Sequence, residues 1–343
     1  MRATVILIFA SCFAAALLLQ WKGNDWEQDV RSFLYRSISD SVPSYSREYI
    51  DENEIPFVVY EPLNGIHPGK RYNPTIVANY AVADLEKLQT RRDTAVQSRF
   101  LKRADWLLNE LDYTGDYAVY RFNWQQPWYD SVGVPFTCGM TSGLAMQVFT
   151  GAWQLTGKAG YLQGARALMR GFYVPIDSGG FTYKDPDGWW YEEIADTGKH
   201  TPRILDGHIF AITGIQYFRE ATGDDSAAYV VQRGIEVLRN RLKTYDAGNW
   251  SIYDAYGKRS DQKYHRLLTA QMKQLADITG DRFFLHYYHE WKKPLDRPYL
   301  LKVVGEGNRS GIMLFLVCWA AVFLTALLLR LLAKQVLTKN LHQ

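Results

Sequence analysis

The chain has few cysteines, and their positions do not suggest a disulfide framework or a zinc cluster. Its 343 residues include three cysteines, Cys12, Cys138 and Cys318. Cys12 and Cys318 lie inside apolar runs, and Cys138 has no histidine near it in the sequence. We interpret Cys138 as a small buried thiol rather than a nucleophile, because free cysteines are commonly buried.

Histidine is also scarce, and the seven histidines lack the spacing of a metal site. His200, His208 and His265 stand apart, and the pair His286 and His289 has no evident third ligand. No Ser-His-Asp order and no glycine-rich phosphate loop stands out either. These absences disfavour metalloenzymes, serine hydrolases and nucleotide-binding proteins.

No long block of like charge is present. The chain has 39 Lys and Arg against 36 Asp and Glu, which gives a net charge of +3 at pH 7. Because the two signs are well mixed, nucleic acid is not indicated as a partner, and an anionic partner is only weakly favoured. Specificity for a charged partner must then come from local groups.

Long apolar runs are present, one near each end of the sequence. Residues 4–19 form an uninterrupted apolar run after Arg2, and residues 311–329 contain no charged residue and precede Arg330. We interpret the first run as an uncleaved membrane anchor or signal-anchor and the second as a transmembrane helix. The cations after the second run favour a cytoplasmic C-terminus, and Arg2 favours a cytoplasmic N-terminus.

This interpretation predicts a membrane-anchored protein whose main domain is extracytoplasmic: periplasmic, extracellular, or lumenal in a eukaryote. The predicted parts are an anchor (1–21), a stalk leading into the domain (22–60), the domain (61–297), a linker (298–310), a transmembrane helix (311–333) and a basic cytoplasmic tail (334–343).

Apolar stripes predict that the central domain is mostly helical. The first helix begins at Asn73, a good N-cap, with Pro74 at the first helical position. Periodicity predicts further helices at about 93–111, 139–156, 159–172, 204–222, 225–243, 262–279 and 282–292. Short strands are predicted at 56–60 and 117–122, and a glycine-rich aromatic segment at 176–194 is typical of a β-hairpin.

A short repeat indicates how these helices are paired. Thr-Gly-Lys at 156–158 and Thr-Gly-Asp at 222–224 and 279–281 each separate one apolar-striped helix from the next. The glycine can form a left-handed C-cap, and the helical pairs recur at intervals of about 60 residues. We therefore predict an all-α-dominated fold. It is an (α/α) toroid of about four helical hairpins with small β-hairpin insertions, flanked by N- and C-terminal transmembrane helices.

Aromatic and acidic side chains gather in the predicted connections between helices. Such rings suit either a sugar-binding groove or ordinary packing of hairpins on the helices. Glu192 and Glu193 follow an apolar aromatic run that can raise a carboxyl pKa, although they also suit an exposed surface pair. Because side chains alternate along a strand, only one of the two glutamates should face a given groove. Tyrosines and aspartates also concentrate in residues 245–275.

Six short motifs occur in order along the chain: Tyr72-Asn73-Pro74-Thr75-Ile76-Val77-Ala78-Asn79-Tyr80, Trp190-Tyr191-Glu192-Glu193, Leu205-Asp206-Gly207, Tyr245-Asp246-Ala247-Gly248, Ile252-Tyr253-Asp254 and Tyr264-His265. In order and approximate spacing they resemble the C-terminal domain of the D-glucuronyl C5-epimerases, of the heparan or heparosan type. The resemblance covers about residues 60–295. It implies a helical toroid that converts D-glucuronate to L-iduronate within a polysaccharide, as an isomerase that needs no cofactor.

The resemblance implies that Glu193, Tyr253 and Tyr264 are catalytic. Glu193 would remove the C5 proton, Tyr264 would donate one from the opposite face, and Tyr253 would bind the carboxylate or relay a proton. An ordinary tyrosine is a poor base at neutral pH, so cations such as Lys263 would have to lie near Tyr264. The expected substrate-binding residues are Trp124, Trp190, Tyr191, Glu192, Asp206, Lys258, Arg259 and His265.

The sequence also departs from the family pattern. Ile194 stands where the family has a tyrosine, and Asp206 stands where it has an asparagine. Two other readings therefore stay open: a uronate polysaccharide lyase that eliminates from the same carbanion, and a non-catalytic, membrane-tethered glycan-binding or assembly protein. The expected partners are a uronic-acid-containing polysaccharide and the membrane, without nucleic acid. Polysaccharide synthesis or export proteins and a homodimer remain open.

Overall fold

The computed structural model describes residues 2–38, 46–129, 131–197, 202–305 and 309–340. The chain divides into two compact units, one made of Met1–Pro43 and Lys293–Gln343, the other of Ser44–Lys292. Each unit is described by itself. Outside the described residues lie 39–45 of the predicted stalk, 306–308 of the predicted linker and 341–343 of the predicted tail.

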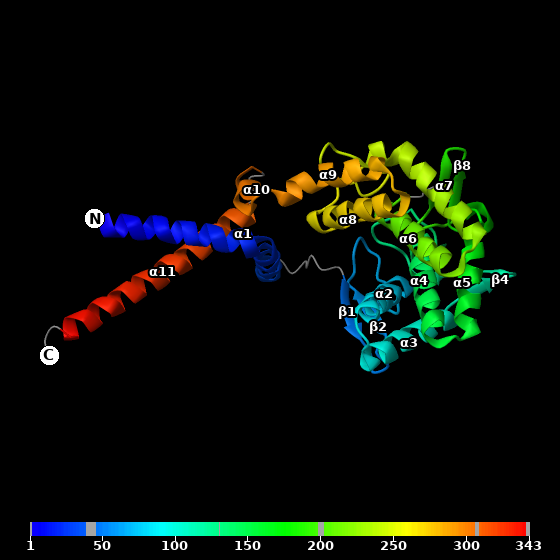
Figure 1. Ribbon diagram of the computed structural model, residues 1–343, viewed down its shortest axis with the longest axis horizontal. Coiled ribbons are helices and arrows are strands. Elements are labelled where there is room, and N and C mark those ends of the chain that lie inside the picture. Colours follow the sequence, from blue (N-terminus) through cyan, green and yellow to red (C-terminus); the bar gives the residue numbers. More distant parts are fainter. Residues whose placement is uncertain (1, 39–45, 130, 198–201, 306–308, 341–343) are drawn as a thin grey trace. The chain divides into compact units, whose positions relative to one another are not determined.

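The second unit, Ser44–Lys292, is built from helical hairpins that form the predicted (α/α) toroid (Figure 1). Its helices are α2 (Pro74–Thr90), α3 (Thr94–Asn109), α4 (Gly139–Thr156), α5 (Ala159–Gly171), α6 (Leu205–Thr222), α7 (Asp225–Arg241), α8 (Gln262–Thr279) and α9 (Arg282–Asp296), the last of which ends in the other unit. Helix α4 packs against α2 and α6, and α6 packs against α8, so these four are the inner helices.

Burial and glycine contacts explain why α4 and α6 occupy the centre. Thirteen of the eighteen residues of α4 are buried, so this helix has no broad polar face. A Cβ on Gly214 would lie 2.0 Å from the carbonyl oxygen of Gly143, and a Cβ on Gly143 would lie 2.6 Å from the Cα of Ala211. The two backbones can approach this closely only because both positions are glycine.

The repeated Thr-Gly motifs end three of the inner helices as predicted. Gly157, Gly223 and Gly280 follow α4, α6 and α8 with φ values of 70°, 69° and 66°. Each glycine donates its N–H to the carbonyl oxygen four residues earlier. The repeat is therefore confirmed as a set of left-handed C-caps.

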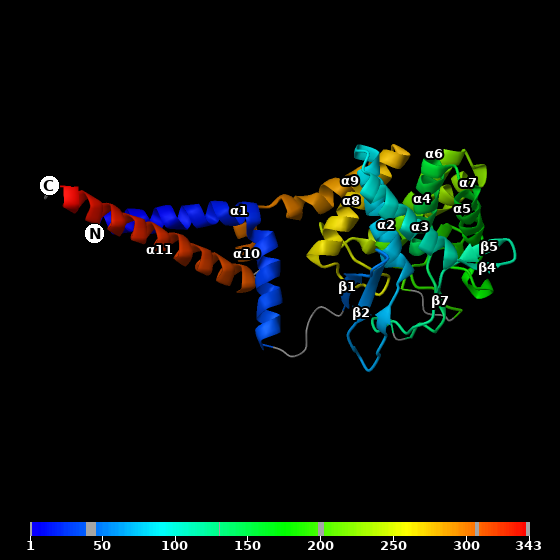
Figure 2. The same ribbon diagram turned by 90° about the horizontal axis from the view of Figure 1, so that it is seen from below.

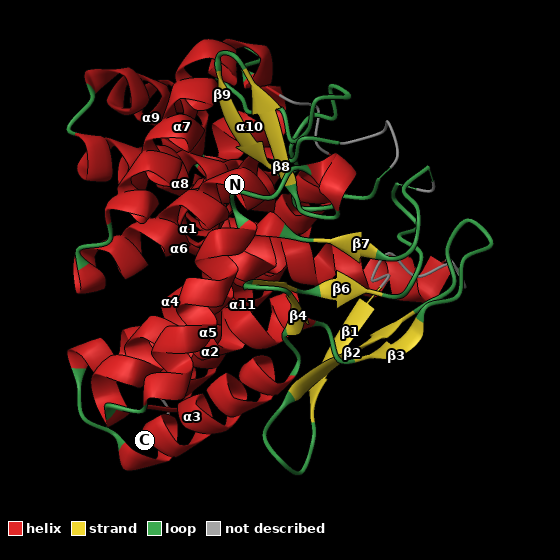
Figure 3. Cartoon of the chain, turned by 90° about the vertical axis from the view of Figure 1, so that its right-hand side faces the viewer, coloured by secondary structure: helices red, strands yellow, loops and turns green. Residues whose placement is uncertain are grey.

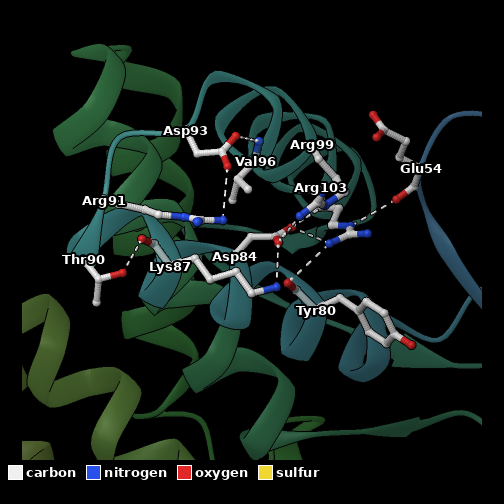
Figure 4. Close-up of polar contacts among 10 residues, drawn as sticks. All are labelled: Glu54, Tyr80, Asp84, Lys87, Thr90, Arg91, Asp93, Val96, Arg99 and Arg103. Atoms are coloured by element: carbon white, nitrogen blue, oxygen red, sulfur yellow. Dashed lines mark hydrogen bonds and ion pairs between the residues drawn. The ribbon is translucent and has the colours of Figure 1, made fainter.

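A buried ion-pair network joins α2 to α3 (Figure 4). The carboxylate of Asp84 on α2 accepts hydrogen bonds from Arg99 and Arg103 on α3, with N–O distances of 2.5 to 3.0 Å. Arg103 is 2% exposed and also donates to the carbonyl oxygen of Glu54 at 3.0 Å. Glu54 lies between β1 and β2, so this bond from Arg103 ties the first helical hairpin to the strands before it.

Within its described residues, the strands of this unit form four small antiparallel sheets. They are β1 (Ser46–Ile50), β2 (Pro56–Tyr60) and β3 (Gly69–Arg71), then β4 (Asp112–Thr114) with β5 (Tyr117–Val119), β6 (Arg121–Phe122) with β7 (Phe136–Thr137), and β8 (Thr182–Asp185) with β9 (Gly188–Tyr191). The last pair is the hairpin predicted within 176–194, after a short 3-10 turn at Ile176–Ser178. Strands and the loops before the inner helices gather on one side of the helices (Figure 3).

Two segments differ from the sequence-based expectation. The run 117–122 is not one strand, because β5 pairs with β4 whereas β6 pairs with β7. Helix α1 (Arg2–Ile38) also continues well beyond the apolar run into the predicted stalk. Strands β1 and β2, which fall in the same predicted stalk, belong to the helical unit.

The first unit contains α1, α10 (Tyr299–Gly305) and α11 (Arg309–Asn340). Thr4–Gly23 and Arg309–Lys334 are long and apolar enough to cross a membrane, judged by length and composition. Helices α1 and α11 pack against each other (Figure 2). Together the two apolar helices are compatible with membrane anchoring.

Candidate active site

A cavity of about 580 Å³ in the Ser44–Lys292 unit lies where all four inner helices begin. The N-cap residues of α2, α4, α6 and α8 all line it: Asn73, Cys138, Ile204 and Asp261. The N-terminus of a helix carries partial positive charge and unpaired N–H groups. Four such ends around one cavity favour an anionic ligand.

Glu193 lines this cavity, and the neighbouring Glu192 does not. Glu192 is fully buried, and its Oε2 accepts a hydrogen bond from the backbone N–H of Arg203 at 3.1 Å. The Oε2 of Glu193 lies against the first turn of α6, where a Cβ on Gly207 would be only 2.3 Å from it. As predicted, one glutamate of the pair faces the cavity, although β9 ends at Tyr191 and both glutamates follow it. The glycine of Leu205-Asp206-Gly207 makes room for Glu193.

Asp206 contributes a second carboxylate to the cavity from the first turn of α6. It is 3% exposed, and its backbone carbonyl accepts a hydrogen bond from Nε2 of Gln271 at 3.1 Å. Burial raises the pKa of Asp206 to about 7, and its own N–H, the N–H of Gly207 and the charge of Lys263 act in the opposite direction. Burial, followed by the charges of Asp206 and Glu192, holds the pKa of Glu193 well above its usual range.

Tyr253 and Tyr264 reach the cavity from the segment before α8 and from its first turn. Asp261 caps α8 by accepting from the N–H of Tyr264 at 2.9 Å, and the carbonyl of Tyr253 accepts from the N–H of Leu205 at 3.0 Å. Their ring centroids are 4.7 Å apart. The two tyrosines are therefore held together beside the start of α6.

The cavity keeps both phenols protonated. Burial, then the charges of Asp206 and Glu193, raises the pKa of Tyr264 to about 12, although a hydrogen bond with Tyr253 opposes the shift. Burial also raises the pKa of Tyr253 far above its usual value. Lys263 lies near Tyr264, as the sequence analysis required, but the pKa of Tyr264 is still raised by burial and by the charges of Asp206, Glu193 and Asp261. Both tyrosines are suited to donate protons rather than to accept them at neutral pH.

Cationic side chains lie on the same side of the cavity as the tyrosines. Lys258, Arg259 and Lys263 line it and are exposed to solvent. The Nζ of Lys258 lies 5.2 Å from the ring centroid of Tyr253, and the Nζ of Lys263 lies 5.7 Å from that of Tyr264. These cations can pair with carboxylates of an acidic sugar polymer.

A buried aspartate fixes the loop that carries Lys258. Asp254 accepts hydrogen bonds from the N–H groups of Tyr256 and Lys258, both at 3.1 Å. It also accepts one from the hydroxyl of Tyr129 at 2.8 Å, which ties this loop to the segment before α4. Asp254 therefore positions the cationic loop instead of facing the cavity itself.

Three expected substrate-binding residues around β9 lie outside the cavity lining. Trp190 is fully buried between His208 and Tyr245, with ring centroids 4.3 and 5.6 Å away. The hydroxyl of Tyr191 donates to the carbonyl oxygen of Val230 at 2.6 Å. With Glu192, these residues pack the hairpin onto the helices, so we remove all three from the substrate-binding set.

His265 and Trp124 also have other partners. His265 is fully buried, stacks on Trp250 at 3.9 Å, and its Nε2 lies 2.9 Å from the carbonyl oxygen of Trp291. Burial lowers the pKa of His265 to about 4, so it is neutral at pH 7. Trp124 packs edge-on against Phe122 at 5.0 Å and does not line the cavity. We remove these two residues from the set as well.

The structure adds cavity residues that the sequence did not single out. On α2, Thr75 and Asn79 line the cavity at i, i+4 spacing. A polar pair on one face of an otherwise apolar helix start could have marked these two positions in the sequence. Tyr60 and Tyr129 also line it, but nothing local in the sequence marks them. Ile194 lies in the lining where the family has a tyrosine. Among the described residues, no group of three or more His, Cys, Asp or Glu is placed to hold a metal ion.

Comparisons with known proteins find a similar sequence and several structures of low sequence identity. An uncharacterized protein of Methanocaldococcus jannaschii is 28% identical over 262 residues, which cover 71% of this chain and 84% of that protein. The cellobiose 2-epimerase of Bacillus thermoamylovorans has a similar fold, with a TM-score of 0.51 and 14% identity over 84% of this chain and 74% of that one. The unsaturated glucuronyl hydrolase of Bacillus sp. GL1 gives a TM-score of 0.45 and 14% identity over 63% of this chain and 60% of that one.

A family match spans more than half of the sequence. The model of the D-glucuronyl C5-epimerase C-terminus matches residues 111–293, which include Glu193, Asp206, Tyr253 and Tyr264. The chain therefore belongs to the D-glucuronyl C5-epimerase C-terminus family, which makes it an isomerase-type enzyme of carbohydrate processing.

Proposed function

We propose that the chain inverts carbon 5 of D-glucuronate residues within a polysaccharide and so produces L-iduronate. The observation that carries this proposal is the meeting of Glu193, Tyr253 and Tyr264 in one cavity at four helix N-termini. Inversion at carbon 5 needs a base on one face of the sugar, an acid on the other, and groups that stabilise negative charge on the carboxylate. The cavity offers all three kinds of group.

Substrate binding would use the positive side of the cavity. The uronate carboxylate pairs with Lys258 or Arg259 and with N–H groups at the starts of the inner helices. Trp128 lines the cavity and is 42% exposed, and a tryptophan ring can stack on the apolar face of a sugar. The neighbouring carboxylates of an acidic polymer can pair with the remaining exposed cations.

Proton transfer would begin at Glu193. Its ionised carboxylate takes the carbon 5 proton, and the electron pair of the C–H bond moves into the enolate of the uronate. The raised pKa makes Glu193 a stronger base once it is ionised. The hydroxyl of Tyr253 and the helix N-termini stabilise the added negative charge by hydrogen bonding.

Tyr264 would complete the inversion. Its hydroxyl donates a proton to carbon 5 from the opposite face, which forms the new C–H bond and leaves a phenolate. Because its pKa is raised to about 12, the hydroxyl is fully protonated before each turnover. In the reverse reaction, from L-iduronate, the phenolate removes the proton and Glu193 returns one.

The test is hydrogen exchange at carbon 5. The full-length chain in detergent is incubated with unsulfated glucuronan-type polymers in deuterated water, and NMR follows deuterium at carbon 5 and the appearance of iduronate. We expect both signals to grow together. Unsaturated products that absorb in the ultraviolet would instead identify a lyase, and binding without exchange would identify a non-catalytic glycan-binding protein.

A further inference from the structure

We propose that Asp206 is the proton relay of this site: it accepts the proton that Glu193 has removed from the substrate and passes it to Tyr264. This inference rests on the proposed function and goes beyond substrate binding, the role that the sequence suggested for Asp206. The relay would return Glu193 and Tyr264 to their starting protonation states, which every turnover requires.

After one inversion, the two sides of the site are in the wrong protonation states. Glu193 holds the proton taken from carbon 5, and Tyr264 has become a phenolate. In the relay, the O–H bond of Glu193 breaks as one forms on Asp206, and that bond then breaks as one forms on Tyr264. The negative charge moves from Tyr264 through Asp206 to Glu193, so no other reactant is needed and both groups are reset.

Asp206 lies in the same cavity as these two groups, on the helix turn against which Glu193 packs. Glu193 packs against the first turn of α6, which carries Asp206 and the Cβ-free Gly207. Tyr264 lines the same cavity, and the N–H of Leu205 donates to the carbonyl of Tyr253, whose ring lies tilted against that of Tyr264. The carboxylate of Asp206 therefore shares the cavity with the base and with both tyrosines, and its charge acts on Glu193 and on Tyr264.

The carboxyl groups of Glu193 and Asp206 are arranged to exchange a proton. Oε2 of Glu193 and Oδ1 of Asp206 are both buried, and neither has a hydrogen-bond partner among the described residues. Within that same part of the chain, neither carboxylate forms an ion pair with a lysine, arginine or histidine. Two buried like charges repel each other, and the charge of Lys263 offsets only part of the shift at Asp206, so sharing a proton lowers the energy of the pair.

The surroundings of Asp206 suit a group that both takes and gives a proton. Its pKa of about 7 is well below that of Tyr264, at about 12, so the transfer to the phenolate is favourable. The charge of Asp206 is the largest charge effect on Tyr264. The other titratable groups that interact with Glu193, Asp206 or Tyr264 are Tyr129, Cys138, Glu192, Tyr253, Asp261 and Lys263.

The kinetic test compares Asp206→Asn with Asp206→Glu in the full-length chain. An amide cannot carry the proton, so Asp206→Asn should lower kcat for carbon 5 exchange by about 10- to 100-fold with KM nearly unchanged, and Asp206→Glu should restore most of it. Removing the charge should also move the acidic limb of the kcat profile to lower pH by about one unit, because Glu193 then ionises more easily. Asp224→Asn is the matched control, because Asp224 caps α7 without lining the cavity and asparagine caps a helix equally well. It should leave that limb in place.

A second measurement does not need activity. A carboxyl group whose pKa is raised in the folded state contributes stability below its unfolded-state pKa, which is near 4. That contribution is lost as pH rises from there through the folded-state pKa. The wild type should therefore lose Tm between about pH 5 and about pH 8, and Asp206→Asn should lose roughly 5 °C less over that range. An equal pH dependence of Tm in the two proteins would overturn the relay.

The outcomes separate the two proposals. If the wild type exchanges hydrogen at carbon 5 and Asp206→Asn has the same kcat and the same acidic limb of its pH profile, the relay is overturned. The epimerase proposal would still stand. Absence of carbon 5 exchange in the wild type would overturn the epimerase proposal, and the relay with it. The relay would also be overturned if Asp206→Asn lowers kcat without moving the acidic limb of the pH profile and Asp206→Glu does not restore kcat. Asp206 would then have a purely structural role.

Discussion

Glu192 and Glu193 are identical neighbours in the sequence, yet the fold gives them different environments. Glu193 faces the cavity beside Asp206, whereas Glu192 bonds the backbone of Arg203. We predict that Glu193→Gln lowers carbon 5 exchange by at least about 1000-fold, because an amide cannot accept the substrate proton. Glu192→Gln keeps an acceptor oxygen for Arg203 and should stay within about threefold of wild type. NMR of exchange in deuterated water measures both.

Glu193 and Tyr264 together set the expected pH dependence of carbon 5 exchange. Glu193 must be ionised to act as the base, and its raised pKa means that exchange rises with pH above the usual range for glutamate. Tyr264 stays protonated until about pH 12, so it should cause no loss of activity below about pH 10. A rate that is constant down to about pH 4 would contradict the role of Glu193.

Some of the site could be predicted from the sequence, and the rest depends on long-range packing. The order of the motifs located Glu193, Asp206, Tyr253 and Tyr264, and all four line one cavity. The same motifs also contain Trp190 and His265, and side chains of these two kinds occur both in substrate-binding sites and in packed cores. Only the placement of the β8–β9 hairpin and of α9 shows that these two are buried against other aromatic rings.

At the scale of elements, the sequence predicted helices better than strand partners. Apolar periodicity and the Thr-Gly caps are local signals, and α4 and α8 have the predicted bounds. The alternation at 117–122 predicted a single strand, but Tyr120 interrupts it. The hydroxyl of Tyr120 donates to the carbonyl of Leu107 at 2.9 Å, and the residues on either side pair with different strands. Alternation does not encode which partner a short strand takes.

The first helical hairpin offers a test of what holds it together. Asp84 is 2% exposed and pairs with Arg103, which is equally buried, and with Arg99 (Figure 4). We predict that Asp84→Asn destabilises the folded chain by about 3 to 5 kcal/mol, because a buried guanidinium loses its counterion. Unfolding in urea, followed by circular dichroism, measures the change in free energy.

An exposed ion pair made by α3, the other helix of this hairpin, is the control for this prediction. Lys102 is 50% exposed and pairs with Glu54 at 2.7 Å. Lys102→Ala should lower the free energy of unfolding by less than about 1 kcal/mol, because water screens an exposed pair. Equal effects of the two substitutions would show that burial does not set the strength of the Asp84 network.

At the scale of the whole molecule, the terminal helices form a unit with specific contacts of its own. The indole Nε1 of Trp319 on α11 donates to Oγ of Ser11 on α1 at 3.1 Å. Near the other end of the pair, Glu27 accepts hydrogen bonds from the hydroxyls of Tyr299 and Ser310 at 2.9 and 3.3 Å. The contact of Ser11 with Trp319 lies within both apolar spans, and polar contacts there stabilise helix pairs because lipid offers no competing partners.

These contacts lead us to propose that α1 and α11 cross the membrane as an antiparallel pair, with both termini in the cytoplasm. We predict that Ser11→Cys and Trp319→Cys, introduced together into a chain whose Cys12 and Cys318 are alanine, are joined in membranes by a short bifunctional thiol reagent. Such a reagent is preferable to oxidation, because a disulfide requires Cα atoms within about 7 Å. After protease cleavage of the Ser44–Lys292 unit, the two halves should migrate together on a denaturing gel.

The control pair uses residues of the same two helices that face away from the contact. Phe9 is 72% exposed and Leu324 is 61% exposed, so cysteines at these positions should point into lipid and remain unlinked. Because both pairs lie within the apolar spans, the reagent reaches them through the same environment. Linking of Phe9→Cys with Leu324→Cys as efficiently as the first pair would mean that the helices meet without a fixed face. The antiparallel pairing would then be wrong even if both helices span the membrane.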